Sequence, residues 1–109
     1  MHNSTDDPSI LKELARAEAA FEKGDAAKAR VAARRAVGIA ITEWIRRSDK
    51  RNYPNDAMRQ MRLFLSEEKL PLEVHNAVER LQARIDHAFK SPSSDPIHDA
   101  IIIINYLFT

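Results

Sequence analysis

The chain has 109 residues, of which 44% are hydrophobic and 30% are charged, and its formal net charge is only +1. This length suits one domain with a single core, and any preference for anions must come from how the charges are distributed. The absence of cysteine excludes disulfides, thiolate catalysis and cysteine-ligated zinc, and two glycines are too few for a turn-rich all-β fold. The composition therefore predicts an all-α protein.

Residues 1–7 are polar and acidic and predict a disordered lead without the apolar core of a signal peptide, so residues 8–109 form the single predicted domain. The longest uninterrupted apolar run, Ala100 to Ile104, is far shorter than a membrane-spanning helix. We therefore expect no membrane contact and a cytoplasmic location.

The first two predicted helices form an antiparallel pair. The first begins at Pro8 or Ser9 and places one apolar stripe at helical spacing. Gly24 suits the position after its last turn, and Asp25 can cap the second helix. So short a turn brings the two helices side by side in opposite directions. The residues of the stripe are Ile10, Leu14, Ala17 and Phe21.

The second predicted helix, Asp25 to Arg47, is the centre of the fold. It is rich in alanine, has no proline and would be roughly 35 Å long. Its middle third is apolar nearly all round, which is typical of a helix covered by neighbours on several sides. Arg30 and Arg34 lie at the edge of its apolar face. We expect them to pair with Glu18 or Glu22 of the first helix. A single polar strip remains, formed by Lys28, Arg35, Thr42 and Arg46.

The third and fourth predicted helices are shorter and amphipathic. The third covers roughly residues 55–68 and turns Arg59 and Arg62 outward. Pro71 breaks the chain and suits the first position of the fourth helix. Two apolar stripes face the core, formed by Ala57, Met58, Met61, Phe64 and Leu65 in the third helix and by Val74, Val78, Leu81, Ile85 and Phe89 in the fourth.

The C-terminal segment is ambiguous, because its four isoleucines favour a strand by propensity. Asp95 followed by Pro96 is typical of a helix start, and no other segment offers a partner strand, so we predict a fifth helix. This helix is apolar on both sides, and one side would face water unless a second copy covered it. The predicted homodimer contact consists of Ile102, Ile103 and Tyr106. The fold is then an antiparallel up-and-down bundle of about five helices with a long central second helix.

Few residues indicate catalysis. The four histidines form no H-x-x-x-H pair and the chain has no glycine-rich phosphate loop, so we expect neither a metal nor a cofactor. Arg80 and His87 of the fourth helix are one candidate catalytic pair, because an arginine can hold a phosphate while an imidazole moves a proton. The alternative is that they belong to the solvated flank of an amphipathic helix.

A basic patch between Arg46 and Arg62 is the stronger candidate site. Six cations and two acids give this stretch a local charge of +4, and Tyr53 offers a ring for stacking on a base. The alternative is that cations near the end of the second helix offset its dipole. The patch residues are Arg46, Arg47, Lys50, Arg51, Tyr53, Arg59 and Arg62.

Two resemblances rest mainly on residues 17–45. The spacing of Phe21, Gly24 and Asp25 matches a tetratricopeptide repeat, but no second copy is present and solenoids need at least three repeats. The A-x-x-x-F-x-x-G-D pattern that starts at Ala17, the A-R-R-A-V run at 33–37 and the order of the helices resemble the HEPN family. Members of that family are small antiparallel helical bundles and are often homodimeric.

The HEPN resemblance implies nucleotidyltransferase partners, toxin–antitoxin pairs or RNA cleavage. Catalytic members carry R-x(4–6)-H, typically with a polar residue after the arginine. Arg80 and His87 match this spacing, but Leu81 follows the arginine. We therefore predict a non-catalytic binding or regulatory module that acts through a protein partner or RNA. The alternatives are a HEPN-type ribonuclease that uses Arg80 and His87, and a purely structural helical adaptor.

Overall fold

Five α-helices and no strand make up the residues that the computed structural model describes, which are 7–48, 57–67, 69–82 and 95–108. The helices are α1 (Pro8–Glu22), α2 (Ala26–Ser48), α3 (Ala57–Glu67), α4 (Leu72–Gln82) and α5 (Pro96–Leu107). The predicted all-α bundle is confirmed, and the C-terminal segment is a helix despite its strand propensity. Residues 1–6 of the predicted lead lie outside the described part of the chain.

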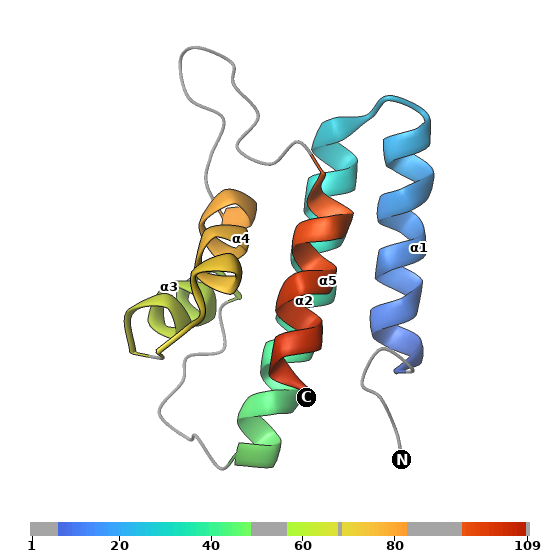
Figure 1. Ribbon diagram of the computed structural model, residues 1–109. Coiled ribbons are helices and arrows are strands. Elements are labelled where there is room, and N and C mark those ends of the chain that lie inside the picture. The colour runs from blue at the N-terminus through green and yellow to red at the C-terminus, as the bar shows by residue number, and fades with distance from the viewer. Residues whose placement is uncertain (1–6, 49–56, 68, 83–94, 109) are drawn as a thin grey trace.

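The long helix α2 is the centre of the bundle, as the sequence predicts, and it contacts each of the other four helices. It lies between α1 on one side and the α3–α4 pair on the other, and α5 packs over it (Figure 1). The helices α1 and α2 are antiparallel. The helix α3 lies across the bundle, and α4 is antiparallel to α2 (Figure 1). The last helix, α5, then has the same direction as α2.

The turn between α1 and α2 follows the signals in its sequence. Gly24 has a positive φ of 79°, in the left-handed region that glycine adopts at little cost. The Gly24 N–H donates to the carbonyl of Phe21 at 3.0 Å, and the Asp25 N–H donates to that of Ala20 at 2.9 Å. The Asp25 carboxylate then accepts from the Lys28 N–H at 3.0 Å and caps α2. These bonds end one helix, begin the next and fix the antiparallel pair.

The same cap chemistry begins the first and last helices. The Asp7 carboxylate accepts from the Ser9 N–H at 2.9 Å, next to Pro8 at the start of α1. The Asp95 carboxylate accepts from the His98 N–H at 3.0 Å, and Pro96 is the first residue of α5. The predicted start of the fifth helix is therefore confirmed.

The core consists largely of the predicted apolar stripes. Phe64 of α3 is fully buried, and its ring meets Trp44 of α2 and Tyr106 of α5 edge-on, at centroid distances of 5.5 and 6.4 Å. Phe21 departs from the prediction, since it is 42% exposed in the last turn of α1, at the end of the bundle. Predicted positions that are buried include Ile10, Leu14, Ala17, Ala33, Ala36, Ala40, Met61, Val74, Val78 and Leu81.

The prediction that one apolar side of α5 faces water is wrong. Ile103 is fully buried, and Ile102 and Tyr106 are half-buried against the core. The physical reason is that α5 packs against both α2 and α4, so the two apolar sides of this helix are both covered within one chain. The apolar side chain that α5 exposes is Ile101, at 36%. Ile102, Ile103 and Tyr106 therefore do not form the exposed apolar patch from which a homodimer contact was predicted.

Arg34 makes a contact that the sequence did not predict. Its Nε donates to the carbonyl of Leu81 at 2.5 Å, so it joins α2 to α4. Arg30, on the same helix, is only 6% exposed. A cation that donates to a carbonyl in the last described turn of α4 also interacts favourably with the helix dipole.

Candidate functional site

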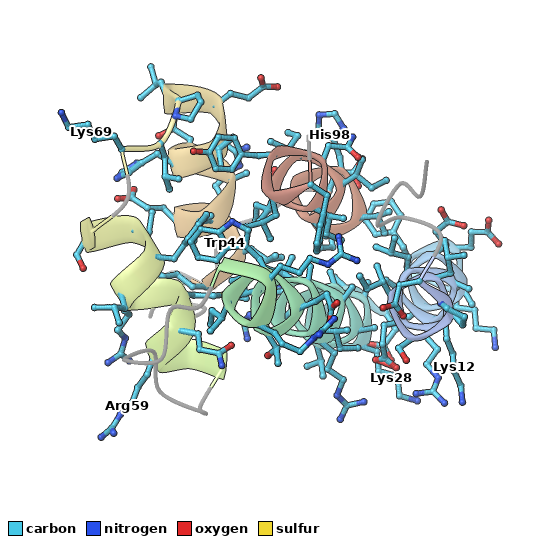
Figure 2. All side chains as sticks on the ribbon, turned by 90° about the horizontal axis from the view of Figure 1, so that it is seen from below. Lys12, Lys28, Trp44, Arg59, Lys69 and His98 are labelled. Carbon is cyan, nitrogen blue, oxygen red and sulfur yellow. The ribbon has the colours of Figure 1, made fainter. Side chains whose placement is uncertain are left out.

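The predicted basic patch is only partly described by the structure. Lys50, Arg51 and Tyr53 lie outside the described residues. Arg46 and Arg47 are in the last turn of α2, and Arg59 and Arg62 are exposed on α3. Figure 2 shows Arg59 pointing away from the bundle at one end of α3.

Glu43 forms ion pairs with both arginines that α2 contributes to the basic patch. Its carboxylate accepts from Arg46 through both oxygens and from the Nε of Arg47 at 3.1 Å. The hydrogen bond from Arg46 first, and that from Arg47 second, lower the pKa of Glu43 to about 2. The Arg47 guanidinium also lies 5.2 Å from the centre of the Phe108 ring, within the range of a cation–π contact. These contacts stabilise the end of α2 within the chain.

The Glu43 ion pairs predict a pH-dependent contribution to stability. The carboxyl titrates at about 2 in the folded protein and near 4.5 when unperturbed. The contribution is therefore present above about pH 4.5 and is lost as the pH falls through 2. We expect wild type to be slightly more stable than Glu43→Gln at pH 7 and the two to converge near pH 2, as measured by urea denaturation. A difference that stays constant over this range would contradict the assignment.

Arg80, the first member of the predicted catalytic pair, joins α4 to α5. Its Nη2 donates to the Asp99 carboxylate at 2.7 Å, and its Nε donates to the same group at 3.2 Å. Asp99 is only 3% exposed, and its hydrogen bond raises the pKa of Arg80. His87 lies outside the described residues. Sequence reasoning missed this pair, although an acidic residue in the first turn of the fifth helix is a visible signal.

A groove between α1 and α2 gathers cations from both helices. It lies on the side of this pair that faces away from α5, where Figure 2 shows the side chains of Lys12 and Lys28. All of these cations are exposed to solvent. They are Lys12 and Arg16 of α1, Lys23 directly after it, and Lys28 and Arg35 of α2. We call this surface the α1–α2 groove.

Helical spacing explains why the cations meet there. In α1 and its C-terminal cap residue Lys23 they recur at intervals of four and seven residues and share one side, whereas Glu18 and Glu22 fall on the other side. In α2, Lys28 and Arg35 are seven residues apart and belong to the predicted polar strip. Each row is visible in the sequence of its own helix, but only the pairing of α1 with α2 makes them one site.

The floor of the α1–α2 groove has two hollows. The hollow near the α1–α2 turn has a volume of about 800 Å³, and one of its side chains, Val31, is 44% exposed. The other hollow, of about 580 Å³, extends toward α3 and reaches Thr42 and Gln60. Arg16 and Arg35 line both hollows, so the two hollows are adjacent along the α1–α2 pair. The small residues of its floor are Ala19, Ala20, Ala27 and Ala32.

Glu13 is a buried carboxylate in the wall of the second hollow. It is 6% exposed, and its Oε1 accepts from the Nη1 of Arg16 at 2.6 Å. Its Oε2 is buried and has no hydrogen-bond partner among the described residues. Glu43 lines the same hollow. The described lining of the groove therefore carries five cations and three carboxylates, with Asp25 at the turn end and Glu13 and Glu43 at the end nearest α3.

The chain matches no protein-family model, no curated protein and no solved structure. The HEPN resemblance therefore stays a prediction. In the described part of the chain, no three histidine or acidic side chains lie close enough to hold a metal ion. None of the described helices is long and apolar enough to cross a membrane.

Proposed function

We propose that this protein is a non-catalytic binding module that engages a protein partner through the α1–α2 groove. The observation that carries the proposal is that two one-sided rows of cations meet along the α1–α2 groove, beside small apolar side chains in the hollow near the α1–α2 turn. No histidine lines the groove along its described length, and the Thr42 hydroxyl donates to the carbonyl of Gly38 at 2.9 Å. The groove thus offers binding groups but no histidine base beside the Thr42 hydroxyl, and the Glu13 carboxylate is already engaged by Arg16.

A protein partner fits the groove better than RNA does. Proteins that bind single-stranded RNA generally stack bases on aromatic rings, and the described lining of the groove contains no aromatic residue. The exposed apolar surface of Val31 and the alanine floor instead suit side-chain packing. In the basic patch, Arg46 and Arg47 share Glu43, which leaves less positive charge for a phosphate backbone. The HEPN resemblance adds a nucleotidyltransferase as one class of partner.

The ribonuclease alternative is less well supported. Catalysis would require Arg80 to meet a phosphate, but its guanidinium is engaged by the buried Asp99 carboxylate. If Arg80 were released, the Asp99 carboxylate, which is 3% exposed, would lose two hydrogen bonds from a cation. Burying a carboxylate without these bonds costs free energy. The geometry thus favours a structural role for Arg80.

Proximity labelling in the native cells tests the proposed function. The full chain, fused to a biotin ligase, is compared with the variant Lys28→Glu/Arg35→Glu and with the matched control Arg59→Glu/Arg62→Glu. Both variants carry the same change in charge on exposed residues. We expect a defined set of labelled proteins that the groove variant loses and the control keeps. Identical labelling by all three would contradict the proposal.

A further inference from the structure

The α1–α2 groove has the dimensions and chemistry to receive a helix. Its lining on α2 extends from Ala27 to Glu43, which corresponds to about 24 Å along the helix axis, or roughly four turns. Two packed helices leave a shallow valley between them, and the alanine side chains on its floor allow another helix to approach closely. A helix laid in such a valley buries one face and keeps its other side in water.

The charges around the floor favour a bound helix with negative charge. Lys23 and Lys28 lie at the turn end of the groove, and Arg16 and Arg35 lie at its middle. The Asp25 carboxylate at the turn end already caps α2. Cations therefore border the floor from both helices, and carboxylates that flank an apolar stripe on the occupant would meet them.

From these observations, and resting on the proposed function, we propose that the docking element of the partner is an acidic amphipathic helix of about four turns. Its small and aliphatic side chains pack on Val31 and on the alanine floor. Its carboxylates pair with Lys28 and Arg35 on one flank and with Lys12 and Lys23 on the other, because Arg16 is already paired with Glu13. The end of the groove near Glu13 and Glu43 repels carboxylates, so the acidic residues of the helix are concentrated at the turn end.

A second copy of this chain is the other occupant to test, because the outer side of α1 carries Glu18, Glu22 and the 46% exposed Leu11. Such a contact would join two different surfaces and would form rings or open chains rather than a twofold dimer. Two carboxylates also offer less charge than the four described cations of the groove other than Arg16 can pair with, since Arg16 already pairs with Glu13. A partner helix with a longer acidic flank is therefore the better match.

A peptide titration of the full chain tests the inference. The probe is a fluorescent, 16-residue helical peptide with one apolar stripe of alanine and leucine flanked by glutamates. Two control peptides have the same composition in scrambled order, or lysine in place of each glutamate. We expect the probe to bind with micromolar affinity, at least tenfold tighter than either control, and to weaken as salt is added. Circular dichroism should show helix formation in the probe.

Variants of the protein test whether the peptide binds in the α1–α2 groove. Lys28→Glu/Arg35→Glu should weaken binding at least tenfold through charge, and Ala27→Trp should do so by filling the floor without a change in charge. Arg59→Glu/Arg62→Glu should bind the probe as wild type does. Circular dichroism of each variant checks that it is folded.

Three outcomes would overturn the inference. The first is equal binding of the probe and its scrambled control, which would indicate a general polyanion site. The second is no peptide binding while proximity labelling still depends on Lys28 and Arg35, in which case the proposed function stands and the helix does not. The third is self-association of the wild type in sedimentation that Lys28→Glu/Arg35→Glu abolishes, which would make a second copy the occupant.

Discussion

Replacement of Ile103 by aspartate should unfold the protein. Ile103 is fully buried in the core, on a helix that packs against both α2 and α4. The substitution removes apolar burial and also forces a carboxylate into a site without water, and the combined cost is about 4 kcal/mol or more. Small domains are stable by only about 5–15 kcal/mol. Circular dichroism and urea denaturation should therefore show a largely unfolded chain, or a midpoint far below that of the wild type.

Ile101→Asp is the matched control for Ile103→Asp. The two isoleucines are two residues apart on α5, but Ile101 is 36% exposed, and its replacement should cost less than about 1 kcal/mol. The prediction fails if Ile103→Asp keeps the wild-type midpoint. If that folded variant also changed from dimer to monomer, Ile103 would be the interface residue that the sequence pattern suggested.

Local signals in the sequence were sufficient to define the turn between α1 and α2 and the start of α5. Gly24 takes the left-handed conformation, Asp25 caps α2, and Asp95 with Pro96 begins α5. Each of these features depends on a side chain and on backbone groups within about four residues of it. Such effects are encoded in short stretches, and they decide the helical state of the C-terminal segment against the strand propensity of its isoleucines.

Contacts between helices are less visible in the sequence. The apolar pattern of α5 is the same whether a neighbouring helix or a second copy covers Ile103, and only the packing of α4 decides between them. Arg34 had acidic residues available on α1 but donates to a backbone carbonyl on α4. Arg80 meets Asp99, which is 19 residues away. A single-helix pattern gives the direction of a side chain but not the identity of its partner.

The α1–α2 groove lies between these two cases. The row of cations on α1 and the row on α2 each follow from helical spacing. The short turn at Gly24 makes the two helices antiparallel, but the rotation of each helix about its own axis decides whether the rows share one groove or lie apart. Burial of Ile10 and Ala17 on α1, and of Ala33 and Ala36 on α2, sets these rotations. The site therefore depends on the core residues as well as on its own cations.

Phe64→Ala should lower the free energy of unfolding by about 3–5 kcal/mol. The Phe64 ring is fully buried and joins α3 to α2 and α5 through edge-on contacts with Trp44 and Tyr106. Truncation removes its buried area, leaves a cavity and abolishes both aromatic contacts, so α3 loses its main attachment to the central helix.

The matched control for Phe64→Ala is Phe21→Ala, which removes the same atoms from a side chain that is 42% exposed, and it should cost less than about 1.5 kcal/mol. Urea denaturation followed by circular dichroism measures both variants. Trp44 fluorescence adds a local readout, because its indole meets the Phe64 ring directly at 5.5 Å. Equal losses of stability in the two variants would mean that α3 is not anchored through Phe64. We expect a larger loss of stability in Phe64→Ala. We also expect Trp44 emission to change before global unfolding, because α3 has few other contacts with α2.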